Sequence, residues 1–112
     1  PSFVVTGNAE VVLRESLLPE AFRHGEGAVA SSFELEDMAK GMIGPFCLEC
    51  IVTDKLEFRV FEVSARIVAG SNVSIGGSPY MNLNEYDNSV GRRIACSIRK
   101  AIEKDRLHDV LS

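Results

Sequence analysis

The sequence lacks several features that would place it in a specialised class of protein. No apolar run approaches the roughly 20 residues that a membrane-spanning helix needs, so we expect no membrane contact. Basic residues are not in excess, because 12 lysines and arginines stand against 16 aspartates and glutamates, for a net charge of −4. A nucleic-acid-binding face is usually basic, so we expect no nucleic-acid partner. Without repeats or low-complexity tracts, the 112 residues fit one small domain with one core.

The N-terminal end carries no initiator methionine, no charged leader and no signal-peptide pattern. Pro1 is followed at once by Ser-Phe-Val-Val, which is typical of a strand. We therefore interpret residues 1–112 as a fragment of a longer protein.

Cysteine is scarce and odd in number, with Cys47, Cys50 and Cys96. An odd count without a secretory leader is typical of reduced thiols in a cytoplasmic protein. Cys47 and Cys50 form a lone C-x-x-C motif, but a zinc site needs two further ligands at similar spacing. We expect all three cysteines to be small core residues.

Hydrophobic spacing predicts two helices. Apolar residues recur at helical intervals over residues 18–35, where Pro19 suits a first turn. Residues 89–104 have the clearest amphipathic pattern, with Ser89 as a candidate N-cap.

Other segments predict strands and loops. Residues 2–6 and 10–14 have the composition of short strands, while residues 67–78 predict a loop that leaves room for one more short strand. Segments 45–53 and 56–64, rich in aromatic and β-branched residues, flank Asp54-Lys55 and predict a β-hairpin. Together these elements predict an α+β fold in which helices flank an antiparallel sheet.

The hairpin carries two glutamates, Glu49 in its first strand and Glu62 in its second. A two-residue turn places Glu49 opposite Val60 and a four-residue turn places it opposite Glu62, and in both cases the carboxylates share a face. A three-residue turn would separate them, because a one-residue slip moves every side chain of a strand to the other face. Simple alternation predicts that one side of the second strand holds Leu56, Phe58, Val60, Glu62, Ser64 and Arg66.

Adjacent carboxylates repel each other and are costly to bury without a counter-charge. Mg²⁺ is a hard cation that binds carboxylate oxygens together with substrate phosphates, so Glu49 and Glu62 are candidate metal ligands. Arg66 on the same side would donate to a phosphate or carboxylate. A solvated hairpin with Glu62–Arg66 and Glu49–lysine ion pairs explains the pattern equally well.

A resemblance favours the metal interpretation. Glu62, Ser64 and Arg66, preceded by Glu49, resemble the Glu-x-Asn-x-Arg metal motif of the ATP-grasp superfamily. Longer segments are similar to the family of archaeal formate-dependent 5-formaminoimidazole-4-carboxamide ribonucleotide synthetases. These segments are residues 6–8, 12–18, 44–49, 61–70 and 91–95.

The resemblance implies the C-terminal part of an ATP-grasp fold, with a metal-bearing hairpin, in a cytoplasmic ligase that forms a C–N bond. That family joins formate to aminoimidazole carboxamide ribonucleotide with ATP, by way of formyl phosphate, in purine biosynthesis. It further implies that Glu49 and Glu62 hold Mg²⁺ or Mn²⁺, that Arg66 is catalytic, and that Asn8 binds the ribonucleotide. No role is assigned to Arg14, Asn72, Arg92 or Arg93.

Two departures and one gap keep alternatives open. Ser64 replaces the superfamily's Asn, and Ala9-Glu10 stands where an apolar-Pro pair is expected. The glycine-rich nucleotide loop of ATP-grasp enzymes is not in these residues, so we expect the chain alone to be inactive. The alternatives are another ATP-grasp carboxylate–amine ligase and a non-catalytic α+β interaction module, and a homo-oligomer is compatible with either.

Overall fold

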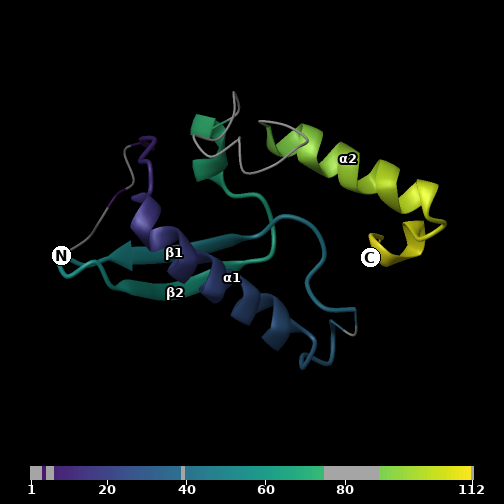
Figure 1. Ribbon diagram of the computed structural model, residues 1–112, viewed down its shortest axis with the longest axis horizontal. Helices are drawn as coiled ribbons and strands as arrows, with labels where there is room; N and C mark the ends of the chain where they lie inside the picture. Colours follow the sequence, from purple (N-terminus) through teal and green to yellow (C-terminus); the bar gives the residue numbers. More distant parts are fainter. Residues whose placement is uncertain (1–3, 5–6, 39, 75–88, 112) are drawn as a thin grey trace.

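The computed structural model describes residue 4 and residues 7–38, 40–74 and 89–111. The longer elements of this part are helix α1 (Leu18–Ser32), strands β1 (Cys47–Val52) and β2 (Phe58–Ser64), and helix α2 (Val90–Glu103). Short 3₁₀ helices also occur: η1 (Glu15–Leu17), η2 (Ala69–Ser74) and η4 (Leu107–Asp109). The predicted α+β class is confirmed. Figure 1 shows α1 lying across the β1–β2 ribbon, with α2 apart from it beside the C-terminal end.

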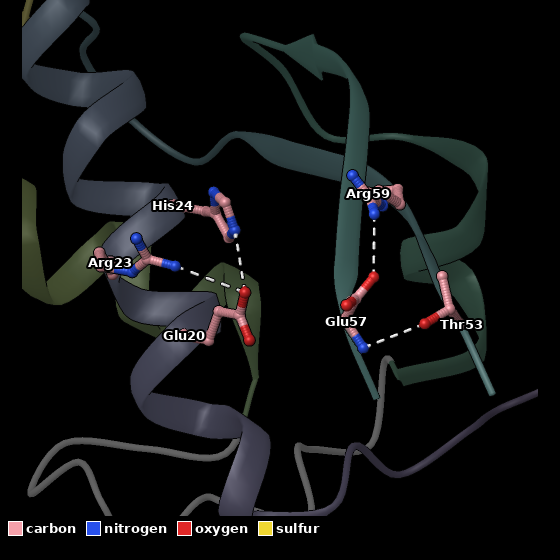
Figure 2. Close-up of polar contacts among 6 residues, drawn as sticks. All are labelled: Glu20, Arg23, His24, Thr53, Glu57 and Arg59. Carbon is pink, nitrogen blue, oxygen red and sulfur yellow. Dashed lines mark hydrogen bonds and ion pairs between the residues drawn. The ribbon is translucent and has the colours of Figure 1, made fainter. Parts of the chain in front are cut away.

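Helix α1 begins where its sequence favours a first turn. Pro19 lies in that turn, where its missing N–H costs no hydrogen bond, and Glu20 follows it at the positive end of the helix dipole. The Glu20 carboxylate lies 3.4 Å from the Arg23 guanidinium and 3.6 Å from the His24 ring nitrogen (Figure 2). The predicted helix is thus confirmed, and the His24 ring also lies 6.0 Å from that of Phe58 on β2.

The helix ends at Ser32, earlier than predicted, because the chain tightens into turns. The N–H groups of Phe33 and Glu34 donate to carbonyls three residues back. The Ser32 hydroxyl donates to the Val29 carbonyl at 2.6 Å and accepts from the Met42 N–H at 2.7 Å. Ser32 is only 4% exposed, so this buried hydroxyl fixes the path of the chain after the helix.

Helix α2 matches its predicted bounds closely. Ser89 is extended, and its hydroxyl accepts from the Arg92 N–H at 3.3 Å, as expected of an N-cap. Among the described residues, Lys40 ties the C-terminal segment to the loop after α1, since its ammonium donates to the carbonyls of His108 and Leu111. No helix in the described ranges has both the length and the apolar character to cross a membrane.

The three predictions for shorter segments were not confirmed in the same way. The strand predicted over 10–14 is wrong, because those residues have no regular structure and Val11 is 85% exposed. The strand predicted over 2–6 lies almost wholly outside the described residues. Of the loop predicted over 67–78, residues 69–74 form η2 and residues 75–78 lie outside the described part.

Burial is sparse in the described part of the chain. Its buried apolar side chains are Leu17 and Ala101, each 8% exposed and on different elements. Large apolar side chains on α1 and the hairpin, such as Phe22 and Phe61, are exposed. The described residues therefore lack the single continuous core expected from the chain length.

The hairpin turn has an odd length. The Thr53 N–H donates to the Glu57 carbonyl at 3.0 Å, so three residues separate the last pair. Within the turn, the Leu56 N–H donates to the Thr53 carbonyl at 2.9 Å, and Leu56 adopts the left-handed conformation with φ of 62°. Figure 2 shows the Thr53 hydroxyl beside the Glu57 N–H, from which it accepts at 3.2 Å. The two-residue and four-residue turns considered from the sequence are therefore wrong, and the turn has the three-residue length that was expected to separate the glutamates.

A β-bulge corrects the register. Val52 pairs with Phe58 and Cys50 with Val60, but the next residue of β1, Glu49, pairs with Glu62. Phe61 is therefore the extra residue on β2. Without the bulge the odd turn would pair Phe61 with Glu49 and send Glu62 to the other face.

The bulge also changes the face assignment of β2. Glu49 and Ile51, two positions apart on β1, share a face, and their partners are Glu62 and Arg59. Phe58 and Val60 consequently belong to the opposite face. The predicted alternation, with both of them beside Glu62, is wrong because it assumed an uninterrupted strand.

Candidate metal centre

The glutamates predicted as metal ligands lie directly opposite each other. Glu49 and Glu62 are cross-strand partners at the end of the hairpin that is remote from its turn. Ser64, the last residue of β2, lies between them: its hydroxyl oxygen is 3.1 Å from Glu49 Oε1 and 3.2 Å from Glu62 Oε1. One oxygen of each carboxylate therefore converges on one hydroxyl.

Neither carboxylate has a cationic partner among the described side chains. Arg59, which shares their face, is bound instead to Glu57 at 2.9 Å, as Figure 2 shows. Arg66 donates to the Ile67 carbonyl at 3.2 Å. The Glu62–Arg66 and Glu49–lysine ion pairs of the solvated-hairpin interpretation do not occur within the described ranges. No ion pair within the described part of the chain therefore compensates the two facing carboxylates.

The donor set suits a hard divalent cation. Carboxylate and hydroxyl oxygens are the ligands that Mg²⁺ and Mn²⁺ prefer, whereas softer metals favour thiolate or imidazole. The described residues contain no group of three or more His, Cys, Asp or Glu side chains arranged to hold a metal ion. The hairpin thus offers two carboxylates, and Mg²⁺ usually takes one or two of these and completes its shell with water and substrate phosphates.

The charges of Glu49 and Glu62 also act on the thiol of Cys47. It pairs with Ser64 across the hairpin and is half-buried. Burial raises the pKa of the Cys47 thiol above its ordinary value, and the charge of Glu49 raises it further, with a smaller contribution from Glu62. The positive charge of Arg66 acts in the opposite direction and lowers this pKa.

The cysteine prediction is only partly met. All three thiols are free, but Cys47 and Cys96 are half-buried and Cys50 is exposed, so they are not core residues.

The remaining predicted site residue, Asn8, lies in the irregular stretch before η1 and is exposed. In the part of the chain that the structure describes, no hydrogen bond joins it to the hairpin. The structure thus brings Glu49 and Glu62 together, leaves Arg66 just beyond the end of β2, and does not bring Asn8 into contact with them.

Sequence reasoning placed Ser64 on the face of Glu62 but missed the contacts that its hydroxyl makes with both carboxylates. The motif marked it only as a replacement for Asn, with no indication that its hydroxyl reaches both carboxylates. The signal was its spacing, because Glu62 and Ser64 are two apart on one strand and share a face.

Comparison with known proteins assigns the whole chain to a family. Residues 1–112 match the family described as "Domain of unknown function (DUF1297)", and the chain belongs to that family.

Several curated relatives are named 5-formaminoimidazole-4-carboxamide-1-(beta)-D-ribofuranosyl 5'-monophosphate synthetase. The chain is 58% identical over 112 residues to the one from Methanothrix thermoacetophila, which covers 100% of this chain and 31% of that protein. It is 52% identical over 113 residues to the one from Saccharolobus solfataricus, covering 100% of this chain and 33% of the relative. The resemblance inferred from the sequence is confirmed, and the chain spans about a third of the length of these relatives.

Proposed function

We propose that this chain is the metal-carrying, C-terminal part of an ATP-grasp ligase that joins formate to aminoimidazole carboxamide ribonucleotide in purine biosynthesis. The observation that carries the proposal is the pairing of Glu49 with Glu62, with one oxygen of each within 3.2 Å of Ser64 Oγ. Similarity to relatives named as the synthetase supports the reaction class. The longer protein that contains this chain is called the parent enzyme below.

Glu49 and Glu62 would hold Mg²⁺ or Mn²⁺ in this enzyme. When bound, the metal supplies charge neutralisation for the β- and γ-phosphates of ATP during phosphorylation of formate to formyl phosphate. The chain's own contribution is positioning, because phosphoryl transfer asks the protein for charge and orientation rather than covalent chemistry. The hairpin provides this with two carboxylates fixed on neighbouring strands.

Arg66 follows the strand that carries Glu62. Its guanidinium is exposed and, within the described residues, binds no carboxylate. Such a group can donate two parallel hydrogen bonds to phosphoryl or formyl phosphate oxygens. We assign it the role of stabilising the negative charge that develops on those oxygens.

Asn8 is assigned to the ribonucleotide. Its side-chain amide carries both a donor and an acceptor, as recognition of a sugar or base edge requires. Its exposure in the described chain leaves that amide available to a substrate.

The test is a substitution in the parent enzyme. Glu62→Gln keeps the shape of the side chain but removes its charge, so formate-dependent ADP release should fall at least about 100-fold, as for the loss of other charge-stabilising groups. Glu57→Gln is the matched control, because Glu57 lies on the same hairpin but pairs with Arg59, and it should keep nearly full activity. Circular dichroism checks that both variants fold. Full turnover by Glu62→Gln would exclude Glu62 as an essential ligand.

A further inference from the structure

The Ser64 hydroxyl is unusual among the polar groups of the hairpin because it is buried. Ser64 is 8% exposed, although most of β2 faces solvent. Its Oγ lies at hydrogen-bonding distance from two carboxylates, Glu49 across the ladder and Glu62 two residues earlier. A buried hydroxyl with two charged neighbours is constrained in a way that an exposed serine is not.

Proton counting limits what this hydroxyl can do. A serine hydroxyl carries one proton, whereas an ionised carboxylate can only accept. Ser64 can therefore donate a full hydrogen bond to one glutamate at a time, and the other carboxylate oxygen faces a lone pair. The hydroxyl cannot neutralise two negative charges, but its proton can hold one oxygen of either Glu49 or Glu62 in place at a time.

The backbone is arranged to make this contact. Phe61 bulges out of β2, and only the register after the bulge places Glu62 and Ser64 on the same face as Glu49. The register without the bulge would leave Ser64 and Glu62 on the face opposite Glu49. The convergence on Ser64 thus depends on the same local irregularity that pairs the glutamates.

We propose that Ser64 is a positioning residue of the metal centre, whose hydroxyl orients the carboxylate of Glu49 or Glu62 for a divalent cation by donating to one of them at a time. The inference rests on the proposed function, because it gives Ser64 a role in the site assigned there. Hydrogen-bond partners of metal ligands fix the orientation of those ligands, and losing one usually lowers metal affinity by roughly 10- to 100-fold. Ser64 acts through the glutamates.

The experiment titrates the parent enzyme with Mn²⁺ and follows free Mn²⁺ by electron paramagnetic resonance. Ser64→Ala should raise the Kd for Mn²⁺ about 10-fold or more, the effect expected for a hydrogen-bond partner of a metal ligand. Ser64→Thr keeps the hydroxyl and should bind Mn²⁺ within about 3-fold of the wild type, as expected if the hydroxyl alone matters. Ser64→Cys replaces the hydroxyl with a thiol, a weak donor of similar volume. It takes the place of Ser64→Ala in the titration if Ser64→Ala does not fold, and the same rise in Kd is expected.

Ser32 provides the matched control. It is even more buried than Ser64 and makes two hydrogen bonds, but both are to backbone groups near the end of α1. Ser32→Ala should lower the thermal stability of the enzyme without changing the Kd for Mn²⁺. An equal rise in Kd for Ser32→Ala and Ser64→Ala would reduce the effect of Ser64 to general destabilisation and overturn the proposal.

The Glu62→Gln variant distinguishes a failure of the positioning role of Ser64 from a failure of the metal centre itself. If Glu62→Gln abolishes Mn²⁺ binding while Ser64→Ala binds like the wild type, the positioning role is wrong and the metal centre stands. If Glu62→Gln leaves the Kd unchanged, the metal centre itself is wrong, and the role of Ser64 is lost with it.

Discussion

Glu49 and Glu62 face each other as cross-strand partners on the hairpin. Like charges directly opposite each other on neighbouring strands destabilise the pair. Among the described residues no ion pair to either glutamate offsets this, because Arg59 is bound to Glu57 and Arg66 donates to a carbonyl. A divalent cation between the carboxylates would turn a repulsive contact into an attractive one, which explains why such a pair is useful in a metal centre.

Cys47 gives a residue-scale prediction that needs no metal. Burial, followed by Glu49, raises the pKa of its thiol, so the folded state favours the neutral thiol. The stability that this contributes is present below the pKa of the unfolded thiol and is lost as the pH rises through the raised pKa of the folded one. Because only the thiolate reacts with iodoacetamide, alkylation of Cys47 should begin at a higher pH in the folded protein than in urea.

Mass spectrometry at the Cys47 peptide measures this alkylation over a pH series. Identical pH midpoints in the folded and urea-unfolded protein would contradict the electrostatic description of this end of the hairpin.

Among the elements, those with a strong local pattern were predictable from the sequence. Helix α2 has one apolar stripe and a serine N-cap, and both signals are local. The strand predicted over 10–14 failed because strand formation depends on a pairing partner, and the described residues provide none for it. The existence of the hairpin, and a shared face for its two glutamates, could also be predicted from the sequence.

The hairpin register was not predictable in detail. Leu56 adopts a left-handed conformation that Gly, Asn or Asp usually signals, so the three-residue turn leaves no trace in the composition. No feature of the sequence indicated the bulge at Phe61 either. The two irregularities compensate each other, so one of the two pairings considered, Glu49 opposite Glu62, is observed although the turn length assumed for it is wrong.

Two single-residue deletions in the parent enzyme test this register. Deleting Phe61 removes the extra residue and leaves Glu62 opposite Glu49, so the Kd for Mn²⁺ should stay within about 3-fold of the wild type. Deleting Val63 moves Ser64 opposite Leu48, on the other face, and should weaken Mn²⁺ binding about 10-fold or more. Mn²⁺ titration measures both, and equal losses in the two variants would contradict the observed register.

At the scale of the whole molecule, the described chain buries little and leaves much apolar surface in solvent. Phe61 is 65% exposed on the hairpin and Ile102 is 57% exposed on α2. The curated relatives are about three times as long as this chain. In the proposed parent enzyme, further polypeptide would contribute the nucleotide-covering loop that these residues lack, and the hairpin would present its carboxylates to a nucleotide held elsewhere.

The most direct test of the metal centre is a crystal structure of the parent enzyme with Mn²⁺ and ATP, in which anomalous scattering locates the metal. We predict a Mn²⁺ ion that touches both Glu49 and Glu62, at about the 2.0–2.2 Å typical of small divalent cations bound by oxygen. A Mn²⁺ ion bound to the nucleotide phosphates but touching neither glutamate would contradict it.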